Sequence, residues 1–159
     1  FFFLNRTNRS GILKAGPIGG KNQESNYSID CRFNKKNLLE KINNIYKYKN
    51  KILLYNKDAI DFINQNINKY RTPCFVNFDP PYYAQGQQLY TNFYKEHNHK
   101  ALYKKIMSCD KPWIVTYDNC EFITDLYQNC KKEDITLSYS AGNKKKGLEV
   151  LFYNKYITL

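Results

Sequence analysis

The sequence has no long apolar run and no paired cysteine pattern. Runs such as Phe1–Leu4 and Val150–Tyr153 fall far short of the roughly 20 apolar residues that a membrane-spanning helix needs. The five cysteines are odd in number and include no C-x-x-C pair, so neither a disulfide framework nor a zinc cluster is indicated. We therefore expect a cytoplasmic protein with reduced thiols and no membrane partner.

Residues at metal-ligand spacing are also lacking. His97 and His99 lie in a polar stretch without cysteine or carboxylate partners at the spacing that a metal site requires. We expect no bound metal here, and interpret this stretch as a mobile loop over a ligand cleft.

Acidic residues are scarce, with 14 Asp and Glu against 25 Lys and Arg, for a formal net charge of +11. Such an excess favours a polyanionic partner, and nucleic acid is the first candidate. The many Asn, Lys, Ile and Tyr residues have a second explanation, the coding bias of an AT-rich genome. Charge alone therefore leaves nucleic-acid binding open.

The length of 159 residues suits one main unit with a short accessory arm. Phe1–Leu4 is typical of the end of a helix, and 11–32, rich in Gly, Asn, Ser and Lys, predicts an irregular arm or hairpin. After Asn34, a suitable helix cap, apolar residues recur at helical spacing and predict a helix over about 35–48.

From Ile52 onward, strands and helices are expected to alternate. Strands are predicted at Ile52–Tyr55, Cys74–Phe78 and Trp113–Tyr117, with a loop over 79–90 and helices at Ala59–Tyr70, near Lys100–Cys109, and from a cap at Asp118 or Asn119 to about Asn129. Ile135–Tyr139 and Leu148–Tyr153 predict a closing antiparallel hairpin around the turn-like Ala141–Gly147. The pattern indicates an α/β fold with a mostly parallel sheet and right-handed crossovers, whose ligands bind at the carboxyl ends of the strands.

Asp79-Pro80-Pro81-Tyr82 follows one of these predicted strands directly. The prolines restrict the backbone and donate no amide hydrogen, so the Asp79 carboxylate and the Pro80 carbonyl can face one cleft as two acceptors. Two acceptors can take both hydrogens of an exocyclic NH2 and make its nitrogen a better nucleophile. Tyr82 could stack on an extruded base, and Tyr83 could do so if Tyr82 faces the core. The alternative is a strand that simply ends in a proline turn.

The motif resembles the signature of adenine-N6 DNA methyltransferases of the DPPY type, and the likeness runs over nearly the whole chain. Other segments similar to that family are Asn5–Ile12 with Gly16–Gly20, Cys31–Lys35, Tyr55–Ala59, Tyr117–Asn119 and Lys144–Leu151. The resemblance implies a partial class I, Rossmann-like, S-adenosylmethionine-dependent methyltransferase sheet with a terminal antiparallel hairpin. Residues 1–33 would form part of a small target-recognition arm, and 34–159 the target-base half of the catalytic domain.

The resemblance also implies a function. The family transfers a methyl group from S-adenosylmethionine to adenine N6 at specific sites in double-stranded DNA and needs no metal. It implies a bacterial or phage restriction-modification setting, with a cognate restriction endonuclease as a second partner. Cytosine-N4 transfer and a non-catalytic DNA-binding remnant are the alternatives.

Site residues follow from the same resemblance. Catalytic roles are implied for Asp79, Pro80, Pro81 and Tyr82, and cofactor contacts for Asn56, Asp58 and Asp79. Asp58 has the alternative role of a helix cap. DNA contacts are expected from Asn5, Arg6, Asn8, Arg9, Lys14, Lys21, Arg32, Lys144, Lys145 and Lys146, although an ordinary basic loop or a solvated lysine turn would look the same.

One part of the family pattern is missing from this sequence. The family's Gly-rich cofactor loop follows an apolar strand, whereas Gly16–Gly20 follows no expected strand and contains Pro17. The only methionine is Met107. We therefore expect the start of translation and the cofactor half to lie upstream of Phe1, and expect the 159-residue chain by itself to bind the cofactor weakly without turnover.

Overall fold

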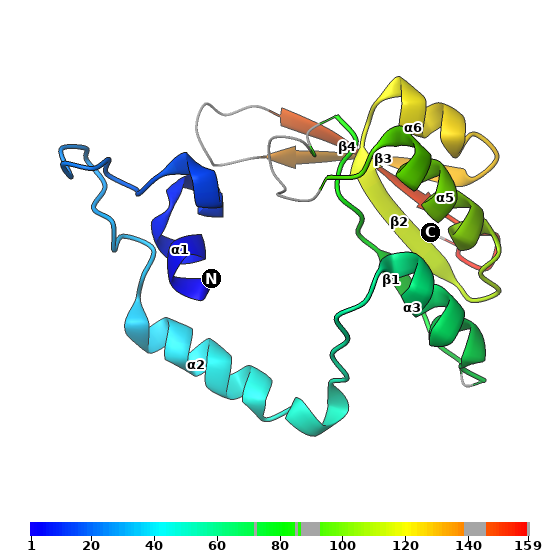
Figure 1. The fold of residues 1–159 in the computed structure, drawn as a ribbon, viewed down its shortest axis with the longest axis horizontal. Helices are drawn as coiled ribbons and strands as arrows, with labels where there is room; N and C mark the ends of the chain where they lie inside the picture. The colour runs from blue at the N-terminus through cyan, green and yellow to red at the C-terminus, as the bar shows by residue number, and fades with distance from the viewer. Residues whose placement is uncertain (72, 85, 87–92, 139–145, 159) are drawn as a thin grey trace. The chain divides into compact units, whose positions relative to one another are not determined.

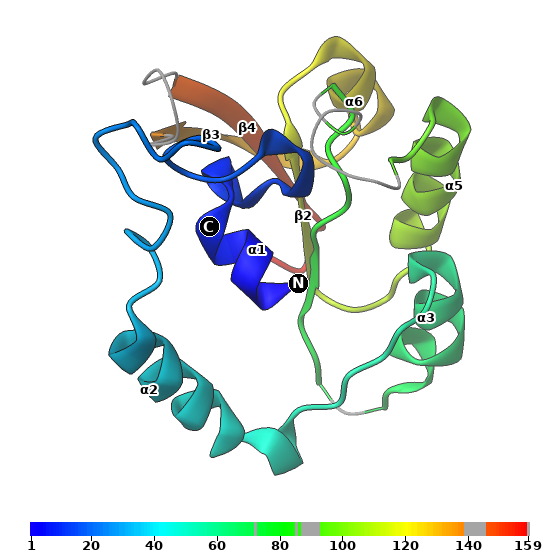
Figure 2. The ribbon, with the colours of Figure 1, turned by 60° about the vertical axis from the view of Figure 1, so that its left-hand side comes forward.

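The computed structural model describes residues 1–71, 73–84, 86, 93–138 and 146–158 (Figures 1 and 2). The chain forms two compact units, Phe1–Tyr55 and Asn56–Leu159. The helix expected over 35–48 thus belongs to the first compact unit. The boundary expected between residues 33 and 34 separates a target-recognition arm from a catalytic domain and does not separate two compact units. This functional division stays a prediction.

The regular structure of the first unit is helical, apart from one isolated antiparallel β-bridge between Asn8 and Pro17. Its elements are α1 (Phe2–Thr7), the 3-10 turns η1 (Arg9–Gly11), η2 (Leu13–Ala15) and η3 (Lys49–Lys51), and α2 (Lys35–Tyr46). Asn34 caps α2, since its side chain accepts a hydrogen bond from the Asn37 amide at 3.0 Å. The predicted cap, the helix and the helical end near Phe1 are confirmed.

Ile52–Tyr55 does not form the predicted strand. The segment pairs with no other strand in the described part of the chain, and its side chains are exposed, Leu54 to 92%. A strand needs a neighbouring strand to pair with its backbone N–H and C=O groups. The apolar composition of a segment does not show whether such a neighbour exists. The β-α-β unit expected to begin here therefore lacks its first strand.

The second unit is built on a four-stranded mixed sheet. Its elements are α3 (Ala59–Gln65), η4 (Ile67–Lys69), β1 (Val76–Phe78), α5 (Glu96–Met107), β2 (Trp113–Asp118), α6 (Glu121–Leu126), β3 (Lys131–Ser138) and β4 (Lys146–Tyr153). The strand order is β1-β2-β4-β3. β1 and β2 are parallel, whereas β4 is antiparallel to both β2 and β3. The closing hairpin is confirmed, but the described sheet is mixed rather than mostly parallel.

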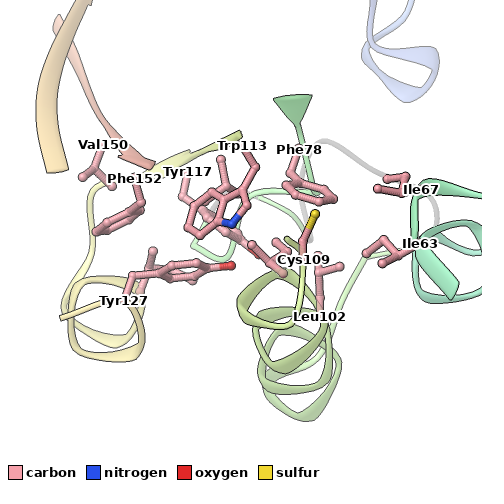
Figure 3. Packing of buried hydrophobic residues seen from close by; sticks show 13 residues of the cluster. Ile63, Ile67, Phe78, Leu102, Cys109, Trp113, Tyr117, Tyr127, Val150 and Phe152 are labelled. Atoms are coloured by element: carbon pink, nitrogen blue, oxygen red, sulfur yellow. The ribbon is translucent and has the colours of Figure 1, made fainter. Parts of the chain in front are cut away.

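One face of the sheet carries the core. Trp113, Val115 and Tyr117 of β2 are each at most 2% exposed, while the residues between them are only half-buried, because alternate side chains of a strand point to opposite faces. Figure 3 shows the buried side chains of β1, β2 and β4 directed toward α3, α5 and α6. α3 and α5 lie side by side in both ribbon views (Figures 1 and 2). The core thus lies between three helices and one sheet face.

α5 and α6 depart from expectation at their beginnings. α5 starts at Glu96, so the loop expected around His97 and His99 is wrong. His99, Leu102 and Ile106 share one helical face and are fully or almost fully buried, because residues three and four apart on a helix face the same way. The N-cap position of α6 is Cys120 rather than Asp118 or Asn119, and its side chain makes no capping hydrogen bond. Asp118 is still part of β2.

The described residues include no helix long and apolar enough to cross a membrane.

The packing makes Phe152 a test of the core. Its ring is fully buried and stacks on Tyr127 with centroids 4.8 Å apart. Phe152→Ala should lower the free energy of unfolding by about 3–5 kcal/mol, because it removes buried area and leaves a cavity. Leu148→Ala on the same strand, at a side chain 60% exposed, should change it by less than about 0.5 kcal/mol. Urea denaturation measures both, and equal losses would contradict this core.

Candidate active site

Three strands bring chain segments to one edge of the sheet. β1 and β2 are parallel, with Phe78 opposite Val115, so the residues that follow both strands lie at the same edge. β4 runs the other way and places Glu149 opposite Asp118. This edge is where open α/β sheets bind their ligands.

Asp79 is the first residue after β1, and its side chain is exposed. The Thr116 hydroxyl of β2 donates a hydrogen bond to Asp79 Oδ1 at 3.4 Å. Pro80 is buried and Pro81 half-buried, and their rings restrict the backbone. The turn therefore anchors its prolines while it presents a carboxylate to solvent.

The two tyrosines that follow have different surroundings. Tyr82 is half-buried, and its hydroxyl donates a hydrogen bond of 2.6 Å to Glu149 Oε1. Tyr83 packs inward, where its ring stacks on Phe122 at 4.3 Å and meets the edge of His99 at 5.5 Å. Of the two rings, Tyr82 is thus the one better placed to meet a ligand.

Asp118 holds the backbone of the same segment. Its Oδ1 accepts from the Tyr83 amide at 2.9 Å, and its Oδ2 accepts from the Ala84 amide at 2.7 Å. The carboxylate is 5% exposed. The role of helix cap expected for this residue is therefore wrong, because its side chain points back to the loop after β1.

A cavity of about 250 Å³ opens beside the turn. Its lining residues are Ala59, Asn77, Phe78, Asp79, Pro80, Pro81, Tyr94 and Leu102. Burial raises the pKa of the Tyr94 hydroxyl, and the negative charge of Asp58 raises it further. The hydroxyl therefore stays protonated at neutral pH, and with Asn77 and Asp79 it is one of the polar groups in a largely apolar wall.

Comparison with known proteins places these features in a family. A family model described as D12 class N6 adenine-specific DNA methyltransferase matches residues 1–140. The chain belongs to this family. The suspected resemblance is thereby confirmed, and adenine N6 is the family's target. The curated proteins include no match to the chain.

Of the three residues expected to contact the cofactor of this methyltransferase, Asp79 lies in the turn after β1, and Asn56 and Asp58 lie at the beginning of the second unit. The Asp58 side chain caps α3 by accepting from the Ile60 amide at 2.8 Å, so its alternative role as a helix cap is confirmed. Because Asp58 raises the pKa of Tyr94, it also lies near the cavity. Asn56 is exposed at the start of the unit. Cofactor contact by either residue stays a prediction.

The DNA-binding residues expected in the first unit fall into two groups. Arg6 and Arg32 are half-buried and donate hydrogen bonds to backbone carbonyls, including Arg6 Nη2 to the Arg32 carbonyl at 2.8 Å and Arg32 Nη2 to the Asn5 carbonyl at 2.8 Å. Asn8 is 6% exposed and bonds the Ile12 carbonyl. These residues hold the arm's two ends together.

The second group faces solvent. Arg9, Lys14 and Lys21 are exposed, while Asn5 is half-buried beside Gly11. Gly11 has a φ of +74°, and a Cβ there would lie 2.9 Å from the side-chain nitrogen Nδ2 of Asn5 and 3.1 Å from its carbonyl oxygen. Glycine suits both this backbone conformation and this close approach. DNA contact by all these residues stays a prediction.

The lysine run expected to contact DNA is mostly outside the described residues. Lys144, Lys145, Tyr139 and most of the expected turn are outside the described residues, whereas Lys146 is the first residue of β4. Among the described residues, no group of three or more His, Cys, Asp or Glu side chains could hold a metal ion.

Sequence reasoning missed the roles of Glu149, Asp118 and Tyr94. Asp118 and Glu149 fall in segments that resemble the family, but that likeness assigns no contact. The signal available in the sequence is an acidic residue within or directly after an apolar strand. Where such a carboxylate is buried, it needs hydrogen-bond donors nearby. Which donors it meets depends on strand pairing.

Beneath the site, His99 is fully buried and its Nδ1 lies 3.0 Å from the Tyr117 hydroxyl. Burial lowers the pKa of His99, and the negative charge of Asp118 offsets part of this effect. Burial also raises the pKa of Tyr117 well above its ordinary value. Both groups are therefore neutral near pH 7.

Acid should destabilise the fold through His99. Its pKa is lower in the folded state, so the unfolded chain binds a proton first as the pH falls below about 6.5. The free energy of unfolding should therefore decrease between about pH 7 and pH 5, and His99→Gln should flatten this dependence. His97→Gln, at an exposed position of the same helix, should leave it unchanged. Urea titrations at several pH values measure this, and an unchanged slope in His99→Gln would contradict it.

Proposed function

We propose that Asp79–Tyr82 is the catalytic segment for methyl transfer to N6 of an adenine extruded from double-stranded DNA. The observation that carries the proposal is the exposed Asp79 carboxylate at the shared end of β1 and β2, beside a cavity. The Asp79 carboxylate and the Pro80 carbonyl accept the two N6 hydrogens, which draws the nitrogen lone pair out of the purine ring and toward an incoming methyl group.

Thr116 and the prolines prepare Asp79 for this role. The Thr116 hydroxyl bonds one carboxylate oxygen, which leaves acceptor capacity for the amine. Because Pro80 is buried, the turn keeps its shape without ordering when the base arrives, and preorganised acceptors cost little reorganisation at the moment of reaction. Methyl transfer would break the S–CH3 bond of the donor and form the N–CH3 bond of the product, and the Asp79 carboxylate or solvent would take the proton that the amine loses.

Tyr82 supplies a stacking surface for the extruded base. Stacking on an aromatic ring offsets part of the few kcal/mol that extrusion costs. Its half-buried ring lies two positions after Pro80, whereas Tyr83 is committed to the core through Phe122.

S-adenosylmethionine is the methyl donor that this proposal requires, and the cavity's chemistry fits part of it. Apolar and aromatic walls from Ala59, Tyr94 and Leu102 suit an adenine ring, and the carboxylates of Asp58 and Asp79 suit its amine and the positive sulfonium. The donor supplies an electrophilic methyl carbon. Asn56 is the third residue proposed to contact it.

Double-stranded DNA is proposed to contact the first unit and the lysines before β4. The exposed side chains of Arg9, Lys14 and Lys21 are suited to phosphates. Four further residues of the arm would shape it or contact DNA themselves: Asn5, Arg6, Asn8 and Arg32. Lys144–Lys146 would add phosphate contacts. A restriction endonuclease as second partner is a further proposal from the family resemblance.

Loss of the Asp79 carboxylate should abolish transfer. Asp79→Ala in the complete protein should lower kcat by at least about a hundredfold, because one of the two amine acceptors is gone. The dissociation constant for DNA should change by less than about threefold. Transfer is measured as N6-methyladenine in digested DNA by mass spectrometry.

The matched control is Asp110→Ala, an exposed aspartate before β2, which should keep the rate of the unmodified protein. Normal turnover by Asp79→Ala would overturn the catalytic assignment. Product at cytosine N4 would favour the alternative base, and a complete absence of methylation by the unmodified protein would favour a DNA-binding remnant.

Charge removal in the first unit should weaken DNA binding without base preference. Each of Arg9→Ala, Lys14→Ala and Lys21→Ala should reduce the slope of log K against log salt by up to about one if that side chain meets a phosphate. Lys155→Ala, exposed in the second unit, serves as the control. Fluorescence anisotropy across a salt series measures the slopes, and unchanged slopes in all three variants would exclude this surface.

A further inference from the structure

Two carboxylates lie side by side below the proposed catalytic turn. Asp118 of β2 and Glu149 of β4 are directly opposite residues in the antiparallel register, so their side chains project from the same face of the sheet. They are 5% and 6% exposed. Like charges at such opposed positions are unfavourable unless donors offset the repulsion and the loss of water.

Donors for both carboxylates come from one short segment. The Tyr82 hydroxyl bonds Glu149 at 2.6 Å, and the amides of Tyr83 and Ala84 bond the two oxygens of Asp118 at 2.9 and 2.7 Å. Hydrogen bonds to ionised acceptors are about twice as strong as neutral ones. Three of them therefore fasten three consecutive residues to the end of β2 and to the middle of β4.

The arrangement holds Tyr82 at both ends. The Tyr83 amide, which follows the Tyr82 carbonyl along the chain, is bound to Asp118, and the far tip of the Tyr82 ring is bound to Glu149. A ring held at its backbone and at its hydroxyl cannot swing about the Cα–Cβ bond. The position of the ring axis is thus set by two residues that are distant in the sequence.

We propose that Glu149 and Asp118 are positioning residues that fix the ring of Tyr82 for stacking on the extruded base. The inference rests on the proposed function of Tyr82. Neither carboxylate needs to touch DNA or the methyl donor. A loose ring would still allow DNA to bind but would hold the base amine less often against Asp79, so the loss falls on turnover.

The test compares Glu149→Ala, Glu149→Gln and Tyr82→Phe in the complete protein. Glu149→Ala and Tyr82→Phe each remove the same hydrogen bond, so each should lower kcat about tenfold, with KM for DNA within about threefold of normal. Glu149→Gln keeps a neutral acceptor and should recover part of the loss. The double variant Glu149→Ala, Tyr82→Phe should be no slower than the slower single variant, because both remove one interaction.

Asp118→Asn tests the other half of the pair. The amide can replace only one of the two accepting oxygens, so either the Tyr83 amide or the Ala84 amide loses its partner, and kcat should fall while KM is retained. Glu133→Ala, at an exposed carboxylate on β3, is the matched control and should behave as the unmodified protein. Thermal denaturation of every variant separates folding from positioning.

The outcomes distinguish this inference from the proposed function. Wild-type kcat in Tyr82→Phe and Glu149→Gln, with a working unmodified enzyme, would overturn the positioning role alone. No methylation by the unmodified protein, or normal turnover of Asp79→Ala, would overturn the proposed function. If Glu149→Ala fails to fold, Tyr82→Phe decides the matter from the half-buried end of the same bond, and additive losses in the double variant count against the inference.

Discussion

The parallel pairing of β1 with β2 is the constraint on which the rest of the site depends. With Phe78 opposite Val115, the chain leaves β1 beside Thr116, and that hydroxyl reaches Asp79. The same register brings the loop after β1 along the last residues of β2, where Asp118 binds its amides. A shift of one residue would turn every side chain of the strand to the other face and separate these groups.

Antiparallel β4 completes the arrangement from the other side of β2. It places Glu149 across from Asp118, and the bond from Tyr82 to Glu149 links the turn after β1 to the last strand of the chain. The core below supports this edge, because Tyr83 stacks on Phe122 and His99 meets Tyr117. Hydrogen bonds from two strands and packing against the core therefore hold the same short loop. The Asp79 side chain remains exposed.

Local patterns predicted most of the elements and the position of the central motif. Asn34 caps its helix, the strand predicted at Trp113–Tyr117 is present as Trp113–Asp118, and the closing hairpin is present. The errors share a cause. Ile52–Tyr55 has the composition of a strand but no described partner, His99 looks polar but completes a buried helical face, and Asp118 looks like a cap but serves a loop far back in the sequence. Each depends on neighbours that a window of sequence does not contain.

By itself, the sequence determined the family and the chemical character of the site. Asp79-Pro80-Pro81-Tyr82 carries its own backbone restriction and its own acceptors, because proline geometry and carboxylate chemistry are properties of the residues. Tertiary structure alone decided which tyrosine packs against the core and which carboxylates hold the loop. Those contacts join residues 34 to 67 positions apart, and only strand pairing and burial bring such distant groups within hydrogen-bond distance.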